Sequence, residues 1–390
     1  MSDDKKSQDL SSRLSSLQKK KEGADAIPEG AGSLSTEKKD TPKMNMIKDV
    51  ASSNVAIQNK EKQPVGLDIG TSHIVMAQGA GDKIQISTQL NAFFTVPNSK
   101  VTFNTLKNNR IKFFEFQDNL YIVGYNAQDF ANMFHTDLRR PIEFGIVSPK
   151  EEEGMAVIQA MLNDLIPKPK NFGEVLCYGV PGEPVKGTGA IVYHEAILGR
   201  YIRSMGYSPM PINEGLATIM AELQKDSFSG IGISMGGGMC NVCMAFMSVP
   251  IFSFSIQKGG DYVNHMAAQS IGESATKVKQ IKEEELDFTK APDSRVMTAL
   301  NIFYEDLVSS LLENLQQVIL STDRMPRFKQ ALPIVISGGT AMPNGFDGKF
   351  KKLLKKYALP IEISDVRVAE DPLNTTAKGA LYVANNEEIE

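Results

Sequence analysis

The sequence has few of the features that mark secreted or membrane-spanning chains. It contains only three cysteines, Cys177, Cys240 and Cys243, in 390 residues, which is too few for a disulfide framework and fits a reducing compartment. The longest apolar stretches, such as residues 331–337, are far shorter than the ~20 residues needed to span a bilayer. The first residues lack the apolar segment of a signal peptide, so we expect a cytoplasmic protein.

Neither sign of charge dominates the chain. Lysine and arginine number 42 and aspartate and glutamate number 46, which leaves a formal net charge of -4. No overall field therefore attracts nucleic acid, and we expect no nucleic-acid partner. A hydrophobic content of 42% is typical of a globular chain, and the length suits two or three domains of about 150 residues each.

The N-terminal region differs in composition from the rest. Residues 1–63 contain no aromatic side chain and are rich in Ser, Gly and Lys. Such a segment cannot bury enough apolar surface to offset its ordering entropy, so we predict a disordered tail. Within it, Leu10, Leu14 and Leu17 fall on one helical face before three lysines, a pattern that leaves open a contact with a partner protein or an anionic membrane.

From Val65 onward, short apolar strands alternate with helical patterns, which predicts an α/β fold. Two segments, 65–77 and 230–247, share one design: an apolar strand, a glycine turn and a returning apolar strand. This repetition predicts two related lobes.

Both glycine turns are candidate phosphate sites. In the first, Asp68 precedes Gly70, Thr71 and Ser72, and glycine lets backbone amides and hydroxyls face a phosphate. Asp68 would hold a hydrated Mg²⁺. The second turn is Gly236, Gly237 and Gly238. Taken alone, each is explained at least as well by an ordinary hairpin turn or a β-bulge.

Two further features have competing interpretations. Cys240 and Cys243 have a metal or redox spacing, but an odd spacing on a strand places side chains on opposite faces, so we expect both to pack in the core. His73 lies in the first turn, where it either faces solvent or touches phosphate or metal.

The order of the motifs resembles the actin superfamily and, within it, the bacterial filament proteins of the MreB and MamK type. The resemblance covers roughly residues 64–385. It rests on short motifs at 66–73, 121–124, 138–141, 145–147, 179–181, 212–215, 259–261, 271–274, 337–341, 368–373 and 377–380.

The resemblance implies an actin-like, two-lobed α/β fold of duplicated ribonuclease-H-like domains, with a nucleotide cleft between the lobes. The implied division is a tail at 1–63, lobe I at 64–211, lobe II at 212–366 and a C-terminal segment at 367–390 that returns to lobe I. Lobe I would have its core at 64–94 and 151–211 and an outer subdomain at 95–150. The outer subdomain of lobe II would be 266–296.

The resemblance also implies a site for ATP or GTP with Mg²⁺. Asp68 would hold the metal, and Glu214 would position the attacking water, which makes these two the catalytic candidates. The nucleotide-binding candidates are Gly70, Thr71, Ser72, His73, Gly236, Gly237, Gly238, Gly259, Gly260, Gly338, Gly339, Thr340 and Met342.

The second turn departs from the family pattern. Relatives carry Asp-x-Gly-Gly-Gly-Thr-Thr followed by Glu or Asp, whereas this chain has Ser234, Met239, Cys240 and Asn241 at the polar positions. Ser234 has no fixed charge to orient metal-bound water, so we predict binding with hydrolysis slowed by roughly 10²-fold or more. The acidic residues near the ribose in MreB align with Thr276 and Lys277, which leaves base and ribose preference open.

The resemblance implies a cytoskeletal protein whose nucleotide closes the lobes, so that closed copies stack head to tail into filaments that position or organise cell contents. Its partners would be further copies of itself, with a membrane or another protein contacted through the tail. Three alternatives stay open: a non-polymerising actin-fold ATP-binding membrane adaptor of the cell-division or pilus type, a sugar-kinase-like enzyme, and a chaperone of the heat-shock ATPase type.

Overall fold

The computed structural model describes residues 63–136, 138–148, 151–186, 191–323 and 325–387. The predicted tail, including Leu10, Leu14 and Leu17, lies outside these ranges except for residue 63. Among the described residues, none of the helices combines the length and the apolar character needed to cross a membrane.

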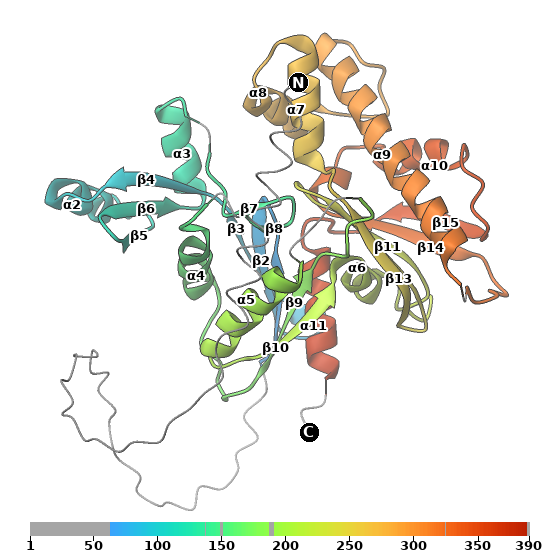
Figure 1. The fold of residues 1–390 in the computed structure, drawn as a ribbon, viewed down its shortest axis with the longest axis horizontal. Coiled ribbons are helices and arrows are strands. Elements are labelled where there is room, and N and C mark those ends of the chain that lie inside the picture. Colours follow the sequence, from blue (N-terminus) through green and yellow to red (C-terminus); the bar gives the residue numbers. More distant parts are fainter. Residues whose placement is uncertain (1–62, 137, 149–150, 187–190, 324, 388–390) are drawn as a thin grey trace, which may run out of the picture. The chain divides into compact units, whose positions relative to one another are not determined.

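The fold alternates strands and helices along the chain (Figure 1). The strands are β1 (Val65–Ile69), β2 (His73–Gln78), β3 (Gln85–Leu90), β4 (Phe93–Pro97), β5 (Phe113–Phe116), β6 (Asn119–Val123), β7 (Ile142–Glu143), β8 (Ile146–Val147), β9 (Val175–Val180), β10 (Ser208–Asn213), β11 (Gly230–Met235), β12 (Cys240–Phe246), β13 (Val249–Ile256), β14 (Leu332–Ser337) and β15 (Ile363–Val368). The helices are η1 (Gly81–Lys83), α2 (Lys100–Asn108), α3 (Tyr125–Met133), α4 (Gly154–Leu165), α5 (Ile191–Ser204), α6 (Glu214–Glu222), α7 (Gly260–Ile271), α8 (Ala275–Glu285), α9 (Arg295–Ser321), η2 (Gly339–Ala341), α10 (Phe346–Leu354) and α11 (Thr375–Asn386).

Two five-stranded sheets share one topology. Their strand orders are β10-β9-β1-β2-β3 and β13-β12-β11-β14-β15. In each, three consecutive strands form an antiparallel meander, and two later strands continue the sheet in parallel from the first strand of that meander. This repetition confirms the predicted duplicated ribonuclease-H-like fold. We call residues 63–213 together with α11 the first half, and residues 230–368 the second half.

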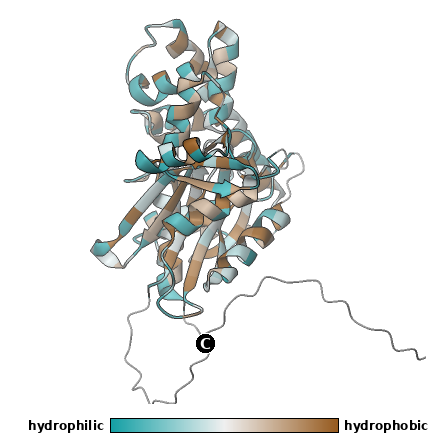
Figure 2. Cartoon of the chain, turned by 90° about the vertical axis from the view of Figure 1, so that its left-hand side faces the viewer, coloured by the Kyte–Doolittle hydropathy of each residue, from teal (hydrophilic) through white to brown (hydrophobic). Residues whose placement is uncertain are grey.

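Each large sheet has its own apolar core. Helices α4 and α5 cover one face of the first sheet, and the apolar stripe of α9 covers one face of the second. In Figure 2, hydrophobic residues occur along the strands between paler and hydrophilic positions. Cys240 packs on the α9 side of the second sheet and Cys243 packs beside α6, which confirms the prediction that the two thiols point to opposite faces. Burial raises the pKa of Cys243 to about 12, so this thiol is protonated at neutral pH.

Helices α6 and α11 connect the two sheets through close backbone contacts. Helix α11 packs on β1 and β9, helix α6 packs on β11 and β12, and the two helices pack on each other. Any Cβ at Gly379 would clash with the backbone of Ala217, and one at Gly232 would clash with the backbone of Gly215. Because these glycines permit close approach, the start of α6 is fixed between the sheets.

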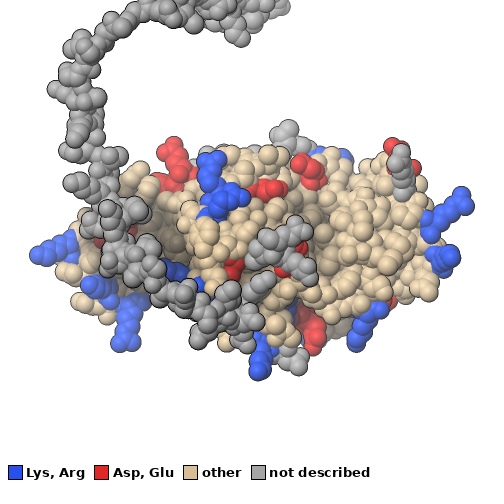
Figure 3. All heavy atoms as spheres, turned by 90° about the horizontal axis from the view of Figure 1, so that it is seen from below, with Lys and Arg blue, Asp and Glu red and all other residues tan. Residues whose placement is uncertain are grey.

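The segment between β3 and α4 forms a small sheet of its own, with strand order β4-β6-β5, and a short β7–β8 hairpin follows it. Phe93 of β4 pairs with Arg139, which brings the chain from this small sheet back toward the first glycine turn. On the face drawn in Figure 3, basic and acidic side chains are interspersed rather than gathered by sign.

Candidate functional site

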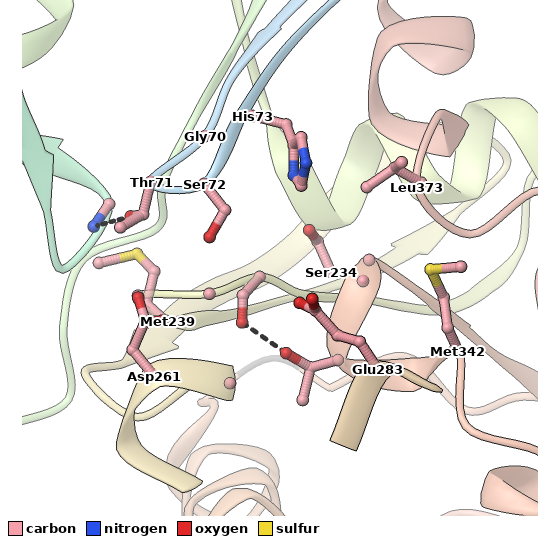
Figure 4. Close-up of a pocket in the computed structure, with 18 of the residues that line it drawn as sticks. Gly70, Thr71, Ser72, His73, Ser234, Met239, Asp261, Glu283, Met342 and Leu373 are labelled. Atoms are coloured by element: carbon pink, nitrogen blue, oxygen red, sulfur yellow. Dashed lines mark hydrogen bonds between the residues drawn. The ribbon is translucent and has the colours of Figure 1, made fainter. Parts of the chain in front are cut away.

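A cavity of about 490 Å³ is lined by residues from both halves and by the first residue of α6. Every predicted catalytic or nucleotide-binding residue lines it except Gly259 (Figure 4). Gly259 lies behind the second turn, where a Cβ would meet the carbonyl oxygens of Gly237 and Gly236 at 2.5 and 2.6 Å.

The two glycine turns have matching backbones and meet at their tips. Gly70 N donates to His73 O, and Gly236 N donates to Met239 O, both at 2.9 Å. A Cβ at Gly237 would clash with Ser72 Oγ, and one at Gly238 with Thr71 Oγ1. Glycine is therefore required in the second turn because the first turn lies directly against it.

Glu214 is the first residue of α6, and its carboxylate is held by two donors from the second half. Asn213 caps the helix by accepting from Gly215 N at 3.0 Å and Leu216 N at 3.2 Å. Glu214 Oε2 accepts from Ser234 Oγ at 3.1 Å and from Asn241 Nδ2 at 2.8 Å. Ser234 and Asn241, two positions that depart from the MreB-type pattern, thus both donate hydrogen bonds to the carboxylate of Glu214.

Asp68, which belongs to the first half, lies near Glu214. Burial raises the pKa of Asp68 well above its usual value, and the Glu214 charge adds to this shift. Burial also raises the pKa of Glu214, although the hydrogen bonds from Ser234 and Asn241 oppose the change. A nearby cation favours the charged form of a carboxyl, so this pair fits a site for a positive ion.

A magnesium ion would find few protein ligands here. Among the described residues, no group of three His, Cys, Asp or Glu side chains is placed to hold a metal. Mg²⁺ commonly takes one or two carboxylates and completes its shell with phosphate oxygens and water, so Asp68 fits it in combination with a phosphorylated ligand.

Cationic side chains approach the cavity from α8. Lys279, Lys282 and Glu283 line it, at the i, i+3 and i+4 spacing of one helix face. Lys282 is only 8% exposed, its Nζ lies 3.5 Å from Gly260 O, and burial lowers its pKa to about 8. These lysines supply positive charge near the second turn, which has none of its own.

His73 points into the cavity from the first turn (Figure 4). Burial lowers the pKa of His73 to about 4, and the charges of Lys279 and Arg140 act in the same direction. The imidazole is therefore neutral at pH 7, and it offers a hydrogen-bonding group rather than a charge.

The end of the cavity away from Ser72 carries apolar side chains. Met342 and Leu373 lie there, beside the glycine pair that follows β14 (Figure 4). Gly338 has a φ of 91°, and its amide donates to Pro372 O at 2.7 Å. Thr340 Oγ1 donates to Gly236 O at 2.8 Å, which ties this end to the second turn (Figure 4).

Sequence reasoning missed the contribution of α8, and in α7 it predicted Gly260 but no later residue as part of the site. The acidic ribose residues of MreB align with Thr276 and Lys277, which do not line the cavity, and the lining residues of α8 begin about one helical turn further along. The polar lining residues that were not predicted include Asp261, Asn264, Lys279, Lys282, Glu283, Asn344 and Thr376. The helical spacing of Lys279, Lys282 and Glu283 was the available signal.

The fold and the arrangement of this site define an actin-like protein. The Volactin family model matches residues 64–384, and the chain belongs to the Volactin family. No curated protein matches the chain.

Solved structures resemble the chain over most of its length. A MamK double helical filament has 17% identity and a TM-score of 0.63, over 84% of this chain and 99% of MamK. A non-polymerising MamK mutant bound to AMPPNP has 18% identity and a TM-score of 0.54, over 83% and 99%. MreB5 of Spiroplasma citri bound to ADP has 16% identity and a TM-score of 0.55, over 82% and 95%. At these identities the likeness shows the shared fold.

Proposed function

We propose that this protein binds ATP or GTP with Mg²⁺ in the cavity and assembles with copies of itself into cytoskeletal filaments. The observation that carries the proposal is the convergence of two glycine turns, one from each half, on a single cavity. The similar structures support it, since one is a MamK double helical filament and others contain AMPPNP or ADP.

The polar and apolar ends of the cavity suit the two ends of a nucleotide. Backbone amides of both turns, with Lys279 and Lys282, offer donors and positive charge to phosphates. The apolar end beside Gly338 and Gly339 lets a flat base lie against the backbone. A ligand held in this way contacts both halves and favours one relative placement of them.

We propose that the moving bodies are lobe I at 64–211, with the C-terminal segment at 367–390, and lobe II at 212–366. Closed copies would then stack head to tail, because a contact between two different surfaces that does not close into a ring generates a filament. We place these filaments in the cytoplasm, where the three buried cysteines, which form no disulfide, would stay reduced.

We propose that hydrolysis is slow. A water-positioning carboxylate acts best when its lone pairs face the water, but Glu214 Oε2 already accepts two hydrogen bonds, so Oε1 is the oxygen left to face a water. Ser234 adds no charge beside it, so only Asp68 remains to orient a metal-bound water. Nucleotide binding and turnover are therefore separate properties of this site.

Nucleotide affinity and filament formation test the proposal together. Calorimetry of the full chain with Mg-ATP, Mg-GTP and Mg-ADP measures binding, and pelleting with electron microscopy measures assembly. We expect binding, and filaments that depend on nucleotide. Binding without filaments at any concentration favours the membrane adaptor, ATP consumption that depends on an added sugar favours the kinase, and no binding overturns the proposal.

A further inference from the structure

An ion pair joins the two halves beside the tips of the glycine turns. Arg140 belongs to the first half, and Asp261 is the second residue of α7 in the second half. Arg140 Nη1 lies 2.9 Å from Asp261 Oδ2 and 3.5 Å from Ser72 Oγ. The two side chains are only 17% and 28% exposed, so this pair is shielded from solvent more than a surface pair.

Asp261 lines the polar end of the cavity, and Arg140, which is not among the lining residues, is held against it by this ion pair. Asp261 lines the cavity near Ser72, away from the apolar end at Met342 and Leu373 (Figure 4). A Cβ at Gly237 would meet Asp261 Oδ2 at 3.3 Å and would clash with Ser72 Oγ. The tips are in contact here, so the ion pair lies beside the point where amides of both tips would hold a phosphate.

The charges of the pair act in opposite directions on such a phosphate. Asp261 repels it, whereas the planar guanidinium of Arg140 is well suited to phosphate oxygens. With the base at the apolar end, the terminal phosphate is the part of the nucleotide that reaches furthest toward Ser72. A triphosphate can therefore compete with Asp261 for Arg140, and a diphosphate is one phosphate shorter.

We infer that Arg140 distinguishes nucleoside triphosphate from diphosphate by exchanging Asp261 for the terminal phosphate. The inference rests on the proposed nucleotide binding and adds a specificity-determining residue to it. The exchange breaks the ion pair that joins the halves here, so the triphosphate itself alters the contact between them. The other cross-contacts, such as Gly182 N to Asn241 Oδ1 at 2.9 Å, do not involve this pair.

The neighbouring arginine provides a matched control. Arg139 donates to Glu151, Glu153 and Thr95, all in the first half, and its guanidinium lies 4.4 Å from the centre of the Phe93 ring. These contacts hold the small sheet against α4 and do not reach the second half. Arg139 is therefore the same residue type as Arg140 and its neighbour in the sequence, but it does not pair with Asp261.

The test compares affinities for Mg-AMPPNP and Mg-ADP by calorimetry on the full chain. For Arg140→Gln we expect about a tenfold loss for Mg-AMPPNP and less than about a twofold change for Mg-ADP, where tenfold corresponds to ~1.4 kcal/mol. For Asp261→Asn we expect a tighter Mg-AMPPNP complex, because the competing carboxylate is gone. For Arg139→Gln we expect an unchanged ratio of the two affinities.

The opposite signs separate phosphate binding from a structural role. If the pair only holds the halves together, Arg140→Gln and Asp261→Asn shift Mg-AMPPNP affinity in the same direction, and that result overturns the inference. Equal losses for both nucleotides in Arg140→Gln also overturn it. If Arg140→Gln fails to fold, Asp261→Asn alone decides by the sign of its effect. A wild-type chain that binds neither nucleotide refutes the proposed function as well, whereas a wild-type chain that binds both with an unaltered ratio in the variants refutes only this inference.

Discussion

The two glycine turns have the same backbone and opposite chemistry. Each joins an antiparallel strand pair, and each is closed by one amide-to-carbonyl hydrogen bond of 2.9 Å. The first turn carries a carboxyl and two hydroxyls, at Asp68, Thr71 and Ser72. The second carries three glycines followed by Met239. A duplicated fold has therefore kept side-chain donors on one side of the cavity and backbone donors on the other.

The difference continues across each hairpin. Asp68 faces the apolar Val75 on the paired strand, whereas Ser234 faces Asn241. Ser234 and Asn241 both donate hydrogen bonds to Glu214. In the second half these two residues hold the Glu214 carboxylate, and neither has a carboxylate of its own. Under the proposed function, the first turn would bind the metal and phosphate, and the second would hold Glu214, the side chain proposed to position the water.

Met239 shows how the second turn has adapted. It is 4% exposed and packs on the β7–β8 hairpin, where a Cβ at Gly145 would meet Met239 Sδ at 2.6 Å. Gly145 has a φ of 72°, and its amide donates to Thr71 Oγ1 at 3.0 Å. A position that is polar in the family pattern is here an apolar contact between the halves.

Restoring the missing charge should give the largest change. In Ser234→Asp, the second turn regains the carboxylate of the family pattern, and we expect phosphate release from Mg-ATP to rise by roughly 10²-fold or more, since one preorganised polar group has about that effect. A single-turnover phosphate assay measures it. Ser234→Asn is the uncharged control and should show no rise. Equal rates for wild type and Ser234→Asp would contradict slow hydrolysis caused by this position.

Methyl groups added to two glycines of the second turn should have unequal effects. A Cβ at Gly238 would clash with Thr71 Oγ1 and meet Gly145 N at 2.9 Å, whereas one at Gly236 meets only Met239 O, at 3.3 Å. Overpacking costs about 1–3 kcal/mol, so Gly238→Ala should weaken Mg-ATP binding by roughly 5- to 150-fold. Gly236→Ala should have a clearly smaller effect. Calorimetry that found equal losses would show that contact between the turns does not set affinity.

The sequence predicted features that depend on local pattern. The glycine turns, the strand pairs beside them and the opposite facing of Cys240 and Cys243 all follow from two-residue periodicity and from turn chemistry. The resemblance then predicted that these segments meet at one cavity. Each of these features is fixed within a few residues or by an ordered set of motifs.

The contacts that the sequence did not predict come from tertiary packing. Helix α8 lies beside the second turn because α7 and α9 pack against it, and no short motif encodes that placement. The hydrogen bonds from Ser234 and Asn241 to Glu214 likewise join three elements. The sequence showed that residue 234 lacks the charge of the MreB-type pattern. It did not show that the Ser234 hydroxyl donates to Glu214.

The positive charge on the second side comes from α8 rather than from the turn, and a small pH effect should reveal it. Lys282, with its pKa lowered to about 8 by burial, is charged below that pH and increasingly neutral above it. Bound phosphates favour the charged amine and raise its pKa, so binding takes up protons near pH 8 and affinity falls as pH rises through that value. We expect a decrease of roughly 3-fold in Mg-ADP affinity between about pH 7 and pH 9, since a full unit of pKa shift corresponds to about tenfold.

Calorimetry in buffers of different ionisation enthalpy counts the protons. Lys282→Met should abolish the proton uptake. Lys277 lies on the same helix as Lys282 but is exposed and paired with Glu273, so Lys277→Met should leave the uptake unchanged. Proton uptake near zero in the wild type at pH 8 would show that Lys282 does not face the phosphates.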